Sequence, residues 1–101
     1  LSPEQQAQAA AHREHAKRKL KMARLLGDGG LLEEARAALG DALHPLGKAL
    51  AIENRLPEPA QRSQLTLPPL TSCFGDALPL IRDFEAGQGD WKSLAEKLGA
   101  L

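Results

Sequence analysis

The sequence predicts an all-α fold, an antiparallel up-and-down bundle of about four helices. Its apolar residues are mostly Ala and Leu, and the 101 residues include two Ile, two Thr and no Val. β-branched residues favour strands, whereas Ala and Leu favour helices. A seven-residue repeat supports this prediction, with Leu at positions 32, 39 and 46 and Ala at positions 35, 42 and 49. Such spacing forms one stripe on a helix, and alternating large with small residues lets two helices pack closely.

The first helix is expected from about Pro3 to Leu26. Ser2 suits the N-cap, Pro3 suits the first turn, and Gln5 lies where a capping-box partner is found. The apolar seam of this helix consists of Ala9, Ala16, Leu20, Ala23 and Leu26. A glycine-rich turn over residues 27–30 follows.

The second helix is expected from about Leu31 to about Asn54. Pro45 lies inside it and has no backbone N–H, so we expect a kink near residues 41–43. The apolar stripe continues beyond the proline through Leu46 and Leu50. This continuity indicates one kinked helix and not two separate helices.

The last third of the chain is predicted to be less regular. Residues 57–69 contain four prolines and form a long loop. A third helix is expected over roughly 70–86, with its first turn or two separate because Gly75 and Pro79 interrupt it. Asp90 caps a short fourth helix from Trp91 to Leu98.

The length predicts a single domain over residues 1–101. Because the chain begins with Leu1 and not with Met, we expect it to be a fragment of a larger protein. Thirteen basic and thirteen acidic residues balance, which indicates neither a bulk nucleic-acid binder nor an acidic tail. The charge is uneven, however, because residues 1–26 carry six basic and two acidic residues, a net charge of +4, and the rest carries −4.

The single cysteine, Cys73, excludes an internal disulfide and a multi-cysteine metal site. It is typical of a reducing compartment, so we expect a cytoplasmic protein. The sequence has no run of about 18 apolar residues, the length that would be needed to span a membrane. Cys73 has no histidine base near it in sequence. We therefore expect its side chain to be buried and to pack as a small apolar residue.

The histidines predict neither catalysis nor metal binding. His12 and His15 share a helical face but lack a third ligand, which favours solvated side chains. His44 follows Arg36 by eight residues. An Arg–His pair could serve a ribonuclease-type site, but a surface histidine near the helix kink is the favoured interpretation. No cofactor or metal is expected.

Four basic residues of the first helix, Arg13, Lys17, Lys21 and Arg24, line one face because they recur at steps of four, four and three. Such a stripe can contact phosphates. No aromatic residues interleave to stack on bases, since the chain has only three aromatic residues. A solvated face opposite the apolar seam gives the same pattern, so both interpretations stay open.

Residues 16–26, the glycine turn, residues 32–35 and Ala42-Leu43 resemble the first two helices of a HEPN domain. HEPN domains are small antiparallel helical bundles. The same stretch, about residues 13–50, is similar to one tetratricopeptide unit through Gly30, Glu34-Ala35 and Ala42-Leu43. No second repeat follows, and a lone repeat cannot bury its face, so the HEPN resemblance is the better match.

Many HEPN ribonucleases carry an Arg followed after four to six residues by a His on a late helix. In this chain seven residues separate Arg36 from His44, on an earlier helix, so the resemblance does not carry ribonuclease activity over. It implies a non-catalytic helical module attached to a helicase, a nucleotidyltransferase or a similar nucleotide-dependent enzyme.

Three functional hypotheses follow. The favoured one is a non-catalytic interaction or accessory domain that mediates protein–protein or interdomain contacts, with Leu43, Pro45 and Trp91 as the candidate partner surface. The second is an auxiliary nucleic-acid-contacting domain of a helicase-like enzyme, which uses the basic stripe. The third is a degenerate HEPN-type ribonuclease, for which we expect no cleavage.

A homodimer is expected under one condition. If Ala9, Ala16 and Leu20 find no partners within the chain, a second copy would supply them across a two-fold axis.

Overall fold

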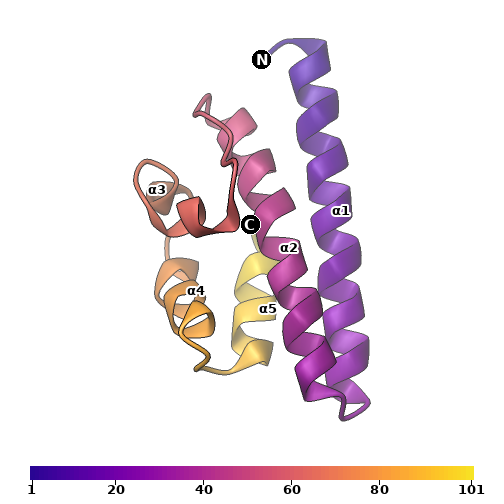
Figure 1. Ribbon diagram of the computed structural model, residues 1–101. Coiled ribbons are helices and arrows are strands. Elements are labelled where there is room, and N and C mark those ends of the chain that lie inside the picture. The colour runs from indigo at the N-terminus through magenta and orange to yellow at the C-terminus, as the bar shows by residue number, and fades with distance from the viewer.

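Two long antiparallel helices form the frame of the molecule (Figure 1). The computed structural model describes residues 1–101, and the two helices are α1, Pro3–Asp28, and α2, Leu32–Glu53. The predicted capping box of α1 is confirmed, because Gln5 N donates to Ser2 Oγ and Ser2 N donates to Gln5 Oε1. Helix α1 ends two residues later than predicted, and Gly30, with φ at 86°, makes the turn into α2.

Helix α2 runs without interruption through Pro45, as the continuing apolar stripe predicts. Pro45 has no N–H to donate, so the Asp41 carbonyl lacks its usual helical partner at this point. Packing compensates for this loss, because Pro45 and the residues that follow it are largely buried. The single helix is confirmed, whereas the kink near residues 41–43 stays a prediction.

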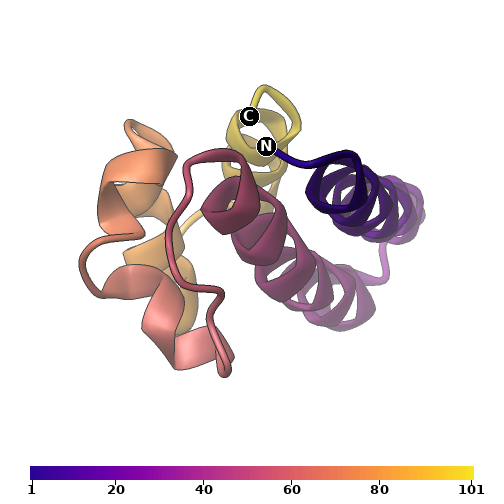
Figure 2. The ribbon, with the colours of Figure 1, turned by 90° about the horizontal axis from the view of Figure 1, so that it is seen from above.

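The second half of the chain packs against α2 with four short elements. They are the 3₁₀ helix η1, Arg62–Thr66, and the α-helices α3, Thr71–Phe74, α4, Ala77–Glu85, and α5, Trp91–Gly99. The expected break in the third helix falls at Gly75, which has φ at 53°. In Figures 1 and 2, α3 and α4 lie on the side of α2 away from α1, while α5 contacts both α1 and α2.

The all-α fold class is therefore confirmed, with five α-helices where about four were predicted. Two details differ. Residues 57–69 are not entirely loop, because Leu65 is buried and holds the η1 turn against the core. Asp90 does cap α5, since its carboxylate accepts hydrogen bonds from Lys92 N and Ser93 N.

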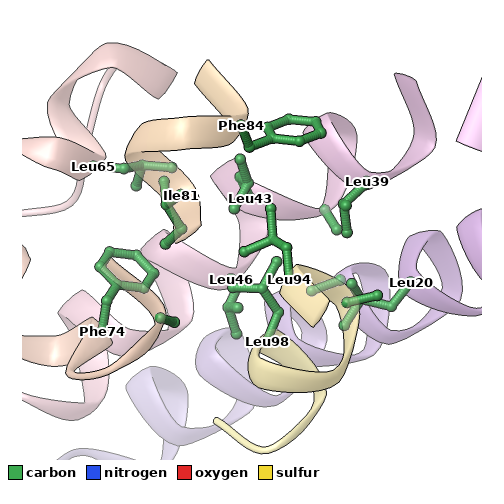
Figure 3. Packing of buried hydrophobic residues seen from close by; sticks show 14 of the residues in the cluster. Leu20, Leu39, Leu43, Leu46, Leu65, Phe74, Ile81, Phe84, Leu94 and Leu98 are labelled. Atoms are coloured by element: carbon green, nitrogen blue, oxygen red, sulfur yellow. The ribbon is translucent and has the colours of Figure 1, made fainter. Parts of the chain in front are cut away.

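The core lies where α2 meets α4 and α5 (Figure 3). It is wholly apolar, because no polar or charged residue is buried. Side chains from six elements meet there, and the cluster includes Leu20, Leu39, Leu43, Leu46, Leu65, Phe74, Ile81, Phe84, Leu94 and Leu98. None of the helices combines the length and the apolar character needed to cross a membrane.

Candidate interaction surfaces

The predicted partner surface is wrong for two of its three residues. Leu43 has 0% of its surface exposed, and Pro45 is also buried. The reason is that α2 is the central helix, covered by α1 on one side and by the short helices on the other. Only Trp91, which is half-buried, remains accessible.

Trp91 packs directly on the backbone of α1. A Cβ added at Gly27 would come within 2.0 Å of the Trp91 ring atom Cζ2, so only glycine fits beneath the indole. Trp91, Arg24 and Asp28 line an open groove of about 320 Å³ between α1 and α5. Arg24 Nη2 donates to the Ala95 carbonyl at 3.3 Å, and this bond fixes α5 against α1 beside the groove.

Two large apolar side chains are exposed where α2 begins, just after the turn that follows Gly27. Leu31 is 49% exposed and Leu32 is 54% exposed. Leu32 belongs to the seven-residue repeat whose next members, Leu39 and Leu46, are buried. The stripe thus extends one step beyond what the chain itself can cover. We call Leu31, Leu32 and Trp91 together the hairpin end.

The basic stripe of α1 is partly used inside the molecule. Arg13 Nη2 donates to Glu53 Oε1 at 2.6 Å, and Arg13 Nη1 donates to the Leu101 carbonyl at 2.9 Å. Arg13 is therefore not free to contact phosphates, which corrects its sequence-based assignment. Arg24 bonds α5 but stays exposed, and Lys17 and Lys21 are exposed and form no ion pair.

The Arg13–Glu53 pair also shifts the pKa values of its two members. The pKa of Glu53 is lowered, mainly because its carboxylate accepts hydrogen bonds from the Arg13 guanidinium. The pKa of Arg13 is raised by the same bonds. The two residues lie 40 positions apart in sequence, and no local pattern connected them.

Arg36 and His44 are held by different parts of the chain. The Arg36 guanidinium lies 4.6 Å from the centre of the Phe84 ring and donates to the Phe84 carbonyl at 3.4 Å. His44 Nε2 lies 2.9 Å from the Pro59 carbonyl oxygen. Each side chain therefore anchors a segment that packs on α2, and the two do not form a common site.

The remaining candidates are also dispersed. His12 Nε2 lies 3.8 Å from Glu58 Oε1, and His15 is exposed. Cys73 is half-buried and packs against the core, so it is less enclosed than predicted. No three His, Cys, Asp or Glu side chains come together in a way that could hold a metal ion.

The self-association condition stated from the sequence is not met. Ala9, Ala16 and Leu20 are at most 5% exposed, because they pack against other helices of the same chain. The seam therefore offers no exposed surface to a second copy, and the homodimer itself stays a prediction.

No protein-family model matches the chain, and no curated protein and no solved structure is significantly similar to it. The HEPN resemblance over residues 13–50 stays a prediction, and the function has to be argued from the surfaces described above.

Proposed function

We propose that this chain is a non-catalytic helical module that binds a protein partner, or another domain of its parent chain, through the hairpin end. The observation that supports this proposal most directly is the exposure of Leu31 and Leu32 at the turn between α1 and α2, where Trp91 packs on Gly27. The free Cys73 thiol, with no second cysteine to pair with, fits a cytoplasmic setting.

Leu32 differs from an isolated surface leucine because it belongs to the seven-residue repeat, and its exposure is therefore better evidence of a binding surface. Single exposed apolar residues are normal on any protein surface. Leu32, however, continues the packed stripe of α2, so a helix laid across it would extend the existing layers of side chains. Tryptophan is enriched among the residues that dominate binding energy, and Trp91 flanks the same end.

The side chains that resembled a catalytic set support this proposal by serving other roles. Arg36 and His44 each bond a backbone carbonyl of a packed segment. Both contacts give these residues a role as structural anchors of segments that pack on α2.

The test compares partner capture by three immobilised proteins: wild type, Leu32→Glu, and the matched control Ala37→Glu. Ala37 is exposed on the same helix, five residues further along. We expect a partner that wild type and Ala37→Glu retain and Leu32→Glu loses. With the purified partner, calorimetric titration should show at least about tenfold weaker binding to Leu32→Glu, roughly 1.4 kcal/mol. Equal binding by all three proteins would overturn the proposal.

A second candidate function is phosphate contact through Lys17 and Lys21. Their exposure and lack of ion-pair partners favour it, as does the net charge of +4 on residues 1–26. Anisotropy titrations of labelled single- and double-stranded DNA and RNA test it. We expect binding that weakens steeply with salt and is lost in Lys17→Glu/Lys21→Glu but not in Lys97→Glu, an exposed lysine on α5. Absence of binding at low salt would eliminate this candidate.

A further inference from the structure

The outer face of α1 is free along its whole length. Helix α1 is the edge element of the molecule, with α2 and α5 on its inner side only (Figures 1 and 2). Six exposed residues recur on the outer face at steps of four and three and so form one stripe. We call them the outer stripe: Ala7, Ala11, Glu14, Arg18, Lys21 and Leu25.

The outer stripe carries the most exposed large apolar side chain of the chain. Leu25 is 66% exposed, and Met22, which is next to the stripe, is 40% exposed. At the opposite end of the helix the stripe holds only alanines, Ala7 and Ala11. Large apolar residues at one end and small ones at the other suit a helix pair that runs antiparallel.

The residues of the stripe are complementary when a second copy is turned end for end. One register places Leu25 of the first copy opposite Ala7 of the second, and it places Lys21 opposite Ala11. The same register brings Glu14 opposite Arg18. Two-fold symmetry repeats each of these pairs, so the centre of the interface contains two Glu–Arg pairs.

Glu14 and Arg18 remain available for such pairing. Within one chain their closest charged atoms lie 3.9 Å apart, and the side chains are 60% and 77% exposed. An exposed pair one helical turn apart contributes little to stability and exchanges readily. Opposite charges at matching positions across a two-fold axis are the charge complementarity that identifies a second copy as the occupant.

From this complementarity we propose that the chain forms an antiparallel homodimer through the outer stripe of α1. The dimer is weak, because a single helix pair buries a small area and Lys17 of both copies lies beside the axis. Its interface differs from the buried seam of Ala9, Ala16 and Leu20, and it does not depend on partner binding at the hairpin end.

Sedimentation equilibrium at rising concentration tests the charge pattern. We expect wild type to self-associate in the micromolar range or above. Glu14→Arg and Arg18→Glu should each weaken association at least tenfold, because like charges then face each other. An equimolar mixture of the two single variants should form a heterodimer, and the double variant should recover the wild-type behaviour. A strictly monomeric wild type at about 1 mM, or a mixture that stays monomeric, would overturn the proposal.

Disulfide trapping tests the register, on a Cys73→Ser background. The double variant Ala11→Cys/Lys21→Cys should form an intermolecular disulfide between position 11 of one copy and position 21 of the other under mild oxidation. Ala11→Cys alone should not, because the two copies of position 11 lie about 15 Å apart in this register, at 1.5 Å of rise per residue. Equal cross-linking of both proteins would contradict the antiparallel register. Leu32→Glu should leave dimerisation unchanged, which separates this proposal from the proposed partner binding.

Discussion

Gly47 shows how one residue is determined by a contact outside its own helix. A Cβ added at Gly47 would lie 2.1 Å from Leu65 Cδ2, and Leu65 is 1% exposed. A glycine in the middle of a helix costs about 0.5–1 kcal/mol relative to alanine. Here the glycine is required because η1 packs directly onto the backbone of α2.

We expect Gly47→Ala to lower the free energy of unfolding by about 1–3 kcal/mol, because the added methyl group overpacks the contact. Urea denaturation followed by circular dichroism measures the change. The matched control is the same substitution in a Leu65→Ala background, where the clash is absent and the higher helix propensity of alanine should prevail. A wild-type background that gains stability would contradict this account.

At the scale of whole elements, features that involve neighbouring residues could be predicted reliably from the sequence. Pairings between residues far apart in the chain could not. The capping box at Ser2 and the cap at Asp90 were predictable, because each involves residues within three positions. The Arg13–Glu53 pair joins α1 to the end of α2 across 40 residues. The sequence therefore presented Arg13 as one member of a free basic stripe, although the fold uses it to fasten two helices.

The Arg13–Glu53 pair should make stability depend on pH. The folded-state pKa of Glu53 lies below its ordinary value of 4.5, so the stabilisation is fully present above that value and is lost as pH falls through the folded-state pKa. For a partly exposed, two-bonded pair we expect about 1 kcal/mol at pH 7.

Urea denaturation of wild type and Glu53→Gln between pH 3 and pH 7 checks this expectation. The difference in unfolding free energy should be larger at pH 7 than at pH 3. Glu33→Gln serves as the control, because Glu33 is exposed and forms no ion pair. A difference that does not change with pH would rule out the ion pair as its source.

For the molecule as a whole, composition and the seven-residue repeat were enough to predict the all-α class. They were not enough to show that α2 is buried on two sides. The repeat marks the stripe of α2 that carries Leu39 and Leu46. The signal for the second buried side was the set of small residues outside the repeat, Gly40, Gly47 and Ala51, which are all buried. Trp91 of the hairpin end was predicted, whereas Leu31 and Leu32 were missed, because the repeat alone does not show at which residue the packing over α2 ends.

Leu43 lies in the shared core, so Leu43→Ala should destabilise the entire domain. We expect a loss of about 2–5 kcal/mol, because the cavity would form between α2 and the short helices. Thermal and urea unfolding followed by circular dichroism measure it. Leu31→Ala, at a residue 49% exposed, should cost much less. Equal losses in the two variants would contradict the burial of Leu43.

The contact between Trp91 and Gly27 gives the protein a built-in optical reporter. The chain has one tryptophan and no tyrosine, so its near-ultraviolet emission comes from this indole. The indole lies where α1 meets α5, with Arg24 and Asp28 beside it. The wavelength and intensity of Trp91 fluorescence therefore depend on the separation of these two helices. A ligand that binds near the groove would change this fluorescence, so its binding could be followed without an attached dye.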